Sequence, residues 1–344
     1  SALGYESLAL NTTGANNAAI GYQALVSNTT GASNVATGRL TLAANTTASN
    51  NTAVGDSALT TNSTGEGNTA VGQGSLDANT TAANNTALGS RSLTSNTTGA
   101  HNTGLGRDAL YSNTVGAYNI AVGEGALYNN VDGSRSVAIG RLALYTQDPA
   151  SAVDMYNVAV GYDAGGKVTT GHSNTVVGGL TGDAITTGDQ NVAVGKGSLT
   201  TLTAGNQNVA VGVSALEAAT TGSTNVAMGQ NAGSSVTSGS NNMFLGTDAG
   251  ITGSPGGNQV TSSNQLALGD ENIAAAYIQV DWAVASDERD KTDFTALDLG
   301  LDFVKALAPV TYKWDKRSKY GDKTADDYDL NAQTPDGTHK EDWM

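Results

Sequence analysis

The chain has 344 residues, no cysteine, and 31 acidic against 16 basic side chains, which gives a net charge of −15. The lack of cysteine excludes disulfides, thiolate nucleophiles and cysteine-ligated metals. The acidity disfavours nucleic acid as a partner, because the phosphate backbone is also negative. No apolar run reaches 18 residues, so we expect no membrane insertion. Forty-four glycines and only three phenylalanines leave little bulk for a thick globular core.

A short phrase, Asn-x-Ala-Val-Gly, recurs along roughly the first four fifths of the chain with a period of 17 residues. Its closing glycines are Gly4, Gly21, Gly38, Gly55, Gly72, Gly89, Gly106, Gly123, Gly140, Gly161, Gly178, Gly195, Gly212, Gly229, Gly246 and Gly269. A period this short and regular is typical of a solenoid, and the constant register of the apolar residues argues against disorder. We therefore interpret residues 1–269 as a shaft of sixteen coils, which we expect to begin at a cut end inside a repeat.

Each repeat combines a strand signal with two turn signals. The residue before the closing glycine is apolar in every repeat except at Thr37, and the residue before that is mostly alanine. Small and β-branched residues favour a short strand, and the glycine gives the backbone freedom to turn out of it. We expect two short strands and two turns per coil, with coils stacked about 4.8 Å apart. We expect the glycines to be structural at Gly21, Gly55, Gly72, Gly123, Gly195 and Gly212.

One chain alone has little apolar surface to bury. The two or three small apolar side chains of a coil return less free energy than the ordering of its backbone costs. Hydrogen bonds between rungs and stacked asparagines contribute, as they do in other stacked sheets. The deficit predicts self-association, in which one apolar line of each coil faces a partner chain.

The phrases NTAVGDSAL (Asn51–Leu59) and NVAVGVSAL (Asn208–Leu216) resemble the head repeats of trimeric autotransporter adhesins. The resemblance covers about residues 1–269 and implies an all-β fold, a left-handed parallel β-roll that assembles as a homotrimer. The period of this chain is longer than the usual coil of that family, which affects the loops more than the fold. Two insertions, one at Pro149 and one at Pro255, are expected to enlarge loops on the outer surface.

The sequence changes character after the last repeat. Residues 270–285 are expected to form a connector, because Tyr277–Trp282 alternates apolar and polar side chains as a strand does. An amphipathic helix is predicted over Thr295–Leu307, and a second strand over Val310–Trp314. The order of these elements predicts a small α+β domain over residues 286–344.

The run Leu299–Trp314, together with Ser286-Asp287, Arg289 and Lys291, resembles the intramolecular chaperone at the C-terminus of phage endosialidases and tail fibres. That resemblance implies a domain that trimerises, guides the folding of a β-rich fibre and then cuts itself off. It places the scissile bond between Ala285 and Ser286, with Ser286 and Lys291 as the catalytic dyad. It also implies supporting roles for Asp287 and Arg289.

The proposed dyad is chemically reasonable, since a serine hydroxyl needs a base and a lysine serves when burial lowers its pKa. The spacing by itself is common, however, and the alternative is a turn at Ser286 followed by a solvated basic patch at Arg289 and Lys291. Such chaperones usually continue into a long C-terminal helix, and this chain ends at Met344 without one. We therefore expect a partial chaperone domain.

Three functions are compatible with these features. The first is a structural fibre of a phage tail or similar appendage on the virion, whose partners are two further copies, a host cell-surface receptor and an upstream virion or tail protein. The second is a trimeric adhesin on the bacterial surface, which needs an outer-membrane β-barrel segment. The third is a glycan-degrading tailspike, which needs a paired set of carboxylates in a cleft. We expect no metal, no cofactor and no external substrate.

Overall fold

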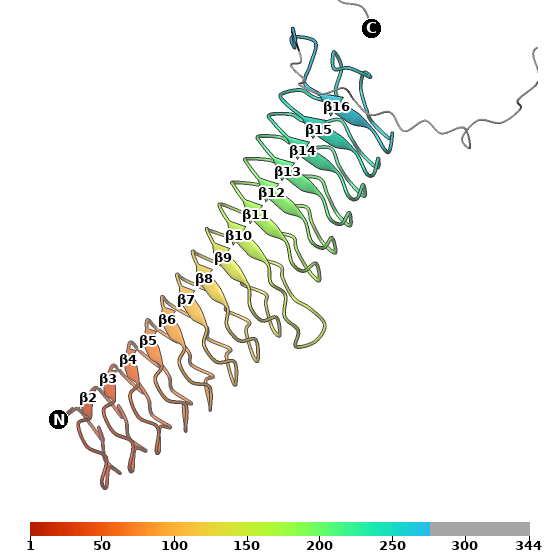
Figure 1. Cartoon of the computed structure of the whole chain (residues 1–344). Coiled ribbons are helices and arrows are strands. Elements are labelled where there is room, and N and C mark those ends of the chain that lie inside the picture. Colours follow the sequence, from red (N-terminus) through yellow and green to blue (C-terminus); the bar gives the residue numbers. More distant parts are fainter. Residues whose placement is uncertain (276–344) are drawn as a thin grey trace, which may run out of the picture. The chain divides into compact units, whose positions relative to one another are not determined.

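The computed structural model describes residues 1–275, which form a parallel β-solenoid (Figure 1). Sixteen strands lie in one sheet in the order of the sequence, and all neighbouring strands are parallel. They are β1 (Ala2–Leu3), β2 (Ala18–Ile20), β3 (Val35–Thr37), β4 (Thr52–Val54), β5 (Thr69–Val71), β6 (Thr86–Leu88), β7 (Thr103–Leu105), β8 (Ile120–Val122), β9 (Val137–Ile139), β10 (Val158–Val160), β11 (Thr175–Val177), β12 (Val192–Val194), β13 (Val209–Val211), β14 (Val226–Met228), β15 (Met243–Leu245) and β16 (Leu266–Leu268). The predicted all-β solenoid with 17-residue coils is confirmed. Within residues 1–275 there is no candidate for a membrane-spanning helix.

The strand register advances by one repeat at every rung. Ala53 of β4 pairs with Ala70 of β5, and the same offset recurs along the sheet. Across the longer step between β9 and β10, Ile139 still pairs with Val160. The inserted residues therefore leave the sheet register unchanged and lie in a loop, which extends past its neighbours before β10 in Figure 1. This confirms the expectation that the first insertion enlarges a loop.

Each three-residue strand turns its central side chain into the coil and its two flanking side chains outward. In β4 the central Ala53 is fully buried, whereas Val54 is 37% exposed. Alanine occupies the central position of most described strands, and larger side chains replace it in these strands only at Val176 and Phe244. The apolar residue before each closing glycine therefore lies on the outer face of the sheet, and the small residue lies in the core.

The predicted second strand of each coil was wrong, because the described coils have one strand each. The segment after the closing glycine is a series of turns, and its buried leucine has a left-handed backbone, as in Leu25 (φ 54°) and Leu59 (φ 53°). A positive φ interrupts the extended backbone that a strand requires. Hydrogen bonds still join the rungs in this segment, since the Leu25 N–H donates to the Thr41 carbonyl at 3.0 Å.

The closing glycines are required by both backbone conformation and space. Gly89 has φ of 140°, and a Cβ built on it would lie 2.5 Å from the carbonyl oxygen of Gly106 in the next coil. No other residue type fits this position without moving the backbone. The same left-handed conformation occurs at Gly21, Gly55, Gly72, Gly123, Gly195 and Gly212.

Candidate functional site

The predicted self-cleavage site lies outside the described residues. This holds for the dyad Ser286 and Lys291, for the scissile residue Ala285 and for the supporting residues Asp287 and Arg289. The residues predicted to form the α+β domain, and most of those predicted to form the connector, also lie outside the described residues. The cleavage chemistry therefore stays a prediction, and the candidate sites that the structure describes lie in the interior and on the surfaces of the coils.

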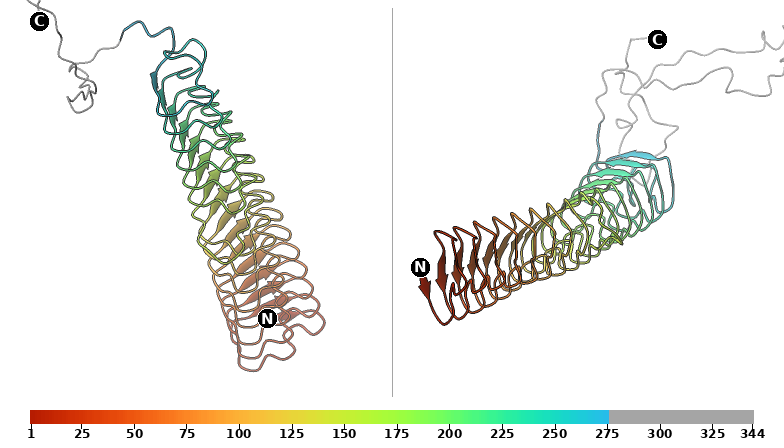
Figure 2. Two further views of the ribbon diagram at one scale, coloured as in Figure 1. Left: turned by 90° about the vertical axis from the view of Figure 1, so that its right-hand side faces the viewer. Right: turned by 90° about the horizontal axis from the view of Figure 1, so that it is seen from below.

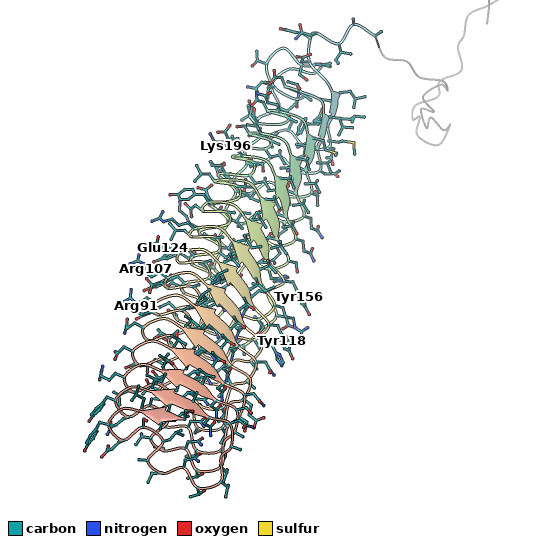
Figure 3. The ribbon with its side chains drawn as sticks, turned by 90° about the vertical axis from the view of Figure 1, so that its left-hand side faces the viewer. Arg91, Arg107, Tyr118, Glu124, Tyr156 and Lys196 are labelled. Atoms are coloured by element: carbon teal, nitrogen blue, oxygen red, sulfur yellow. The ribbon has the colours of Figure 1, made fainter. Side chains whose placement is uncertain are left out.

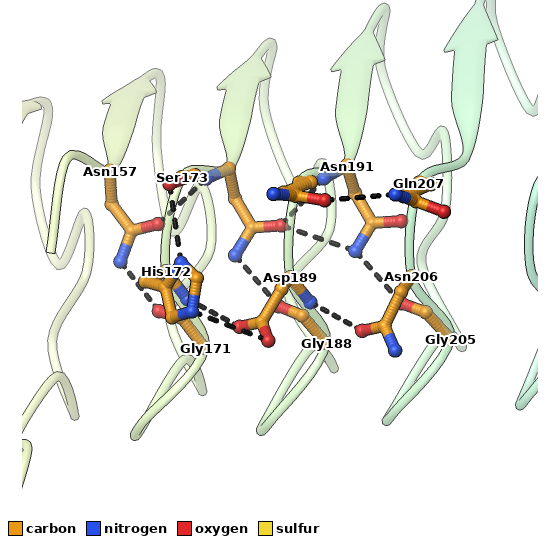
Figure 4. Close-up of polar contacts among 12 residues, drawn as sticks. Asn157, Gly171, His172, Ser173, Gly188, Asp189, Asn191, Gly205, Asn206 and Gln207 are labelled. Carbon is orange, nitrogen blue, oxygen red and sulfur yellow. Dashed lines mark hydrogen bonds and ion pairs between the residues drawn. The ribbon is translucent and has the colours of Figure 1, made fainter.

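An asparagine ladder runs through the interior beside the strands. The side-chain oxygen of Asn51 accepts the backbone N–H of Asn68 at 2.9 Å, and its amide nitrogen donates to the Gly65 carbonyl at 2.9 Å. The same arrangement is visible at Asn157 and Asn191 in Figure 4. These amides are buried and their polar groups are paired, so they stabilise the stack of coils rather than form a binding site.

A second asparagine ladder lies in the turn opposite the strands. Within the described residues it runs through the coils of the N-terminal half, up to residue 147. The Asn79 amide nitrogen donates to the Asn62 side-chain oxygen at 2.8 Å. This ladder ends at Gln147, whose amide nitrogen donates to the side-chain oxygen of Asn130 at 2.8 Å. The oxygen of Gln147 accepts a hydrogen bond from Asn157 at 2.9 Å, so Gln147 joins the second ladder to the first.

Beyond Gln147 the same column of the interior is apolar. Its side chains are fully buried and are Val168, Ile185, Leu202, Ala219 and Val236. The solenoid thus has N-terminal coils (residues 1–147), with two amide ladders, and C-terminal coils (residues 157–268), with one amide ladder and one apolar column. The change coincides with the first loop insertion.

The flanking side chains of the strands form a continuous surface, which we call the outward sheet face. Its first column comprises Ala18, Val35, Thr52, Thr69, Thr86, Thr103, Ile120, Val137, Val158, Thr175, Val192, Val209, Val226, Met243 and Leu266. Its second column comprises Ile20, Thr37, Val54, Val71, Leu88, Leu105, Val122, Ile139, Val160, Val177, Val194, Val211, Met228, Leu245 and Leu268. None of these positions carries a charge, and Figure 2 shows the strands following one another along one side of the coils. A long apolar strip of this kind is unusual on the surface of a monomer.

Charged and aromatic side chains gather beside the strands instead. In Figure 3, Arg91, Arg107, Glu124 and Lys196 lie to one side of the strands. Arg91 also forms an ion pair with the carboxylate of the next coil, Asp108, at 2.9 Å. Arg39 and Asp56, both exposed, pair across one repeat in the same way at 2.7 Å. An exposed pair contributes little stability, but a pair between residues one repeat apart favours the observed register.

Aromatic rings stack along the same surface. The rings of Tyr111, Tyr128 and Tyr145 lie parallel to one another with centroids 4.9 and 5.1 Å apart, and Arg91 covers the free face of Tyr111 at 5.4 Å. Burial is the main cause that raises the pKa of the Tyr128 hydroxyl. The three rings are partly buried and cover one another, so the stack is a side-chain ladder like the asparagine ladders rather than an open aromatic platform.

Titratable groups in the C-terminal coils do not assemble into a metal site. Across residues 1–275 no group of three or more histidine, aspartate or glutamate side chains is placed to hold a metal ion. In Figure 4, His172, Asp189 and Asn206 follow one another on successive coils, with His172 Nε2 3.5 Å from the Asp189 carboxylate. Elsewhere burial raises the pKa of the carboxyls of Asp163 and Asp183. These groups are spread along the rod and form no catalytic cluster within the described coils.

Comparison with known protein families bears on the C-terminal segment. Residues 286–333 match the family described as chaperone of endosialidase. The match confirms the resemblance seen in the sequence, and it covers the end of the chain rather than the solenoid. No curated protein matches the chain. The endosialidase chaperone is associated with trimeric phage fibres, and a β-solenoid followed by such a segment fits a tail-fibre or tailspike-like protein.

Proposed function

We propose that this protein is a structural fibre of a phage tail or similar appendage and that it assembles as a homotrimer. The observation that carries the proposal is the outward sheet face, which is free of charge along the whole solenoid and is followed in the sequence by the endosialidase chaperone segment. Apolar surfaces of this extent mark protein contacts. Three copies that pack these faces together bury side chains that one coil leaves in water.

The chaperone segment has a physical purpose in such a fibre. Successive coils are nearly identical, so two chains displaced by one rung would still present matching strands to each other. Contacts between chains are also distant in sequence and slow to form. A domain that first holds three C-termini together sets the register before the coils associate. This supports a fibre with a dedicated trimerisation domain over an independent repeat protein.

In this proposal the solenoid supplies length and stiffness between an upstream virion or tail protein and a receptor on the host surface. The coil surfaces beside the strands present different side chains from rung to rung, including Tyr118 and Tyr156 on one side and Lys196 on the other (Figure 3). A variable surface on a regular scaffold is suited to receptor contact. The proposed location is the virion, at the tail.

The proposal includes one covalent step, the removal of the chaperone. The hydroxyl of Ser286 loses its proton to the amine of Lys291 and attacks the carbonyl carbon of Ala285, which forms an ester between Ala285 and the Ser286 oxygen. The peptide C–N bond breaks in the same step, and Lys291 returns the proton to the released α-amino group of Ser286. Water then hydrolyses the ester, which frees the carboxylate of Ala285 and the hydroxyl of Ser286. A trimer that has lost its chaperone cannot easily reassemble once unfolded. Its stability is then kinetic, which means that it is set by how slowly the trimer unfolds.

Expression of the full-length chain tests the proposal. The wild type, Ser286→Ala and the control Ser318→Ala are compared by intact mass and by mass in solution. A shorter product in the wild type and in Ser318→Ala, absent from Ser286→Ala, supports self-cleavage. A single uncut species in all three refutes the cleavage step while leaving the fibre intact. A monomeric mass in all three refutes the fibre itself.

A further inference from the structure

The outward sheet face is not uniform along the chain. In its first column, strands β4–β7 carry threonine at Thr52, Thr69, Thr86 and Thr103. From β8 to β16 the same column is apolar at every strand except β11. The second column is apolar in nearly all strands. The C-terminal strands therefore present two apolar columns side by side, and the strands β4–β7 present one apolar column beside a hydroxyl column.

This difference matters for a contact between chains. Threonine and valine have nearly the same shape, but a buried hydroxyl without a hydrogen-bond partner costs free energy that a methyl group does not. Apolar side chains of the face are exposed in both parts, with Leu88 at 45% and Met228 at 48%, so the two parts differ in how many apolar side chains each strand presents. The face thus offers the largest gain from burial in its C-terminal strands.

We propose that strands β8–β16 of the outward sheet face form the anchoring contact between copies of this chain, and that strands β4–β7 join it afterwards at a smaller gain. This inference rests on the proposed function and specifies which part of the surface holds the fibre together. The occupant is a second copy, because an identical face has the same rung spacing and the same absence of charge. The segment that matches the endosialidase chaperone follows the solenoid in sequence, so chains joined there meet the doubly apolar strands first.

Two substitutions at equivalent positions separate the two parts of the face. Val209 in β13 and Thr69 in β5 both begin their strands and are both partly exposed. In a Ser286→Ala background, which keeps the chaperone segment attached, we expect Val209→Asp to lower the amount of oligomer recovered after refolding by at least about tenfold, because three unpaired carboxylates become buried together. We expect Thr69→Asp to lower it by less than about twofold, and Thr69→Val to leave it unchanged or raise it.

Several controls keep the result interpretable. Far-ultraviolet circular dichroism establishes whether each variant forms the solenoid, and Val209→Thr removes apolar surface without adding charge, so it tests the same contact if Val209→Asp does not fold. Val209→Thr is expected to shift assembly in the same direction by a smaller factor. Equal losses for Val209→Asp and Thr69→Asp, or a larger loss for Thr69→Asp, overturn the inference. A wild-type chain that is itself monomeric refutes the proposed function instead.

Discussion

The N-terminal and C-terminal coils share one backbone geometry but fill it with different chemistry. In the N-terminal coils the turn opposite the strands is held by hydrogen-bonded amides, such as Asn79 to Asn62 at 2.8 Å. In the C-terminal coils the same column is a row of buried aliphatic side chains that includes Leu202. Strand pairing and register are the same in both. The coil shape is therefore set by the strand and its closing glycine. The interior position of the turn, which we call the turn column, accepts either a complete amide ladder or a row of aliphatic side chains.

Gln147 shows how the two interiors meet. Its side chain is one methylene longer than asparagine, and it reaches both the last amide of the second ladder, Asn130, and the first ladder at Asn157. The amide of Gln147 is thus paired at both its nitrogen and its oxygen at the point where the apolar column begins. A half-satisfied amide in that position would cost about 1–3 kcal/mol. The junction therefore allows the two chemistries to share one solenoid.

The closing glycines provide the largest expected effect, and they test whether the backbone is common to both regions. Gly89→Ala and Gly195→Ala each place a Cβ about 2.5 Å from a backbone oxygen of the next coil, at φ of 140° and 127°. We expect either change to destabilise the fold by more than about 3 kcal/mol, measured as a loss of thermal stability. Gly179→Ala is the control, since no atom lies within 4 Å of its Cβ. Tolerance of alanine in one region alone would contradict the shared geometry.

A reciprocal exchange in the turn column sharpens the comparison between amide and apolar interiors. Asn79→Leu leaves Asn62 without its donor and Asn96 without its acceptor, and Leu202→Asn buries an amide among aliphatic side chains. We expect each to cost about 2–4 kcal/mol in unfolding experiments. The joint change of Asn62, Asn79 and Asn96 to leucine should cost less than the sum of the single changes, because neighbouring amides are removed together. Additive losses would show that the two interiors are not interchangeable.

A smaller effect is expected at the junction. Gln147→Leu removes the donor to Asn130 and the acceptor from Asn157, although Asn157 keeps its hydrogen bond to the Gly171 carbonyl. We expect a loss of about 1–2 kcal/mol and faster amide hydrogen exchange in the coils on both sides. Gln190→Leu, at an exposed position of the C-terminal coils, is the matched control. If both variants behave as the wild type, the junction has no special role.

The smallest effect concerns the carboxylate of Asp183. Burial raises its pKa, and one of its oxygens is buried without a partner. The folded state therefore binds a proton more readily than the unfolded state, so this group lowers stability above its folded pKa and ceases to do so as the pH falls through it. We expect Asp183→Asn to raise the melting temperature by about 1 °C at neutral pH.

That gain should disappear in acid, where Asp183 is protonated in the wild type as well. Asp77→Asn is the control, because Asp77 lies five residues after its closing glycine, as Asp183 does, but in the N-terminal coils. A gain for Asp183→Asn that persists at low pH would point to a cause other than the carboxylate charge. Melting curves of the two variants across the pH range provide the test.

Much of the fold follows from sequence because the period is short and strict. The regular glycines predict the solenoid and its rung spacing, and the alanine and valine of each phrase predict the strand. The second strand could not be excluded in the same way, because leucine rarely adopts the left-handed backbone that Leu25 has. Stacking against identical neighbours imposes that conformation, which no single repeat reveals. The change from Asn130 to Val168 was visible in the sequence. That it replaces a buried amide ladder with an apolar column could be recognised only once the structure showed that these side chains face the interior.

The functional residues were predicted less completely. One apolar line of each coil was expected to face a partner chain, without saying which line. The structure places the apolar residue before each glycine on the outward sheet face, exposed as at Val54. The cleavage dyad at Ser286 and Lys291 came from a family resemblance, and its geometry lies outside the described residues. Strand alternation fixes which way a side chain points, whereas a catalytic pair depends on contacts between distant residues that spacing cannot supply.

Cross-linking through single cysteines tests the central claim most directly, since the chain has no cysteine of its own. Val194→Cys places a thiol on the outward sheet face, and Thr187→Cys places one on the exposed turn of the preceding coil. With a short bifunctional maleimide, and in a Ser286→Ala background that keeps the chain at 34.5 kDa, we expect Val194→Cys to form a covalent pair of twice that mass and Thr187→Cys to stay at the single-chain mass. Cross-linking of Thr187→Cys, with none for Val194→Cys, would show that copies of the chain do not meet through the sheet.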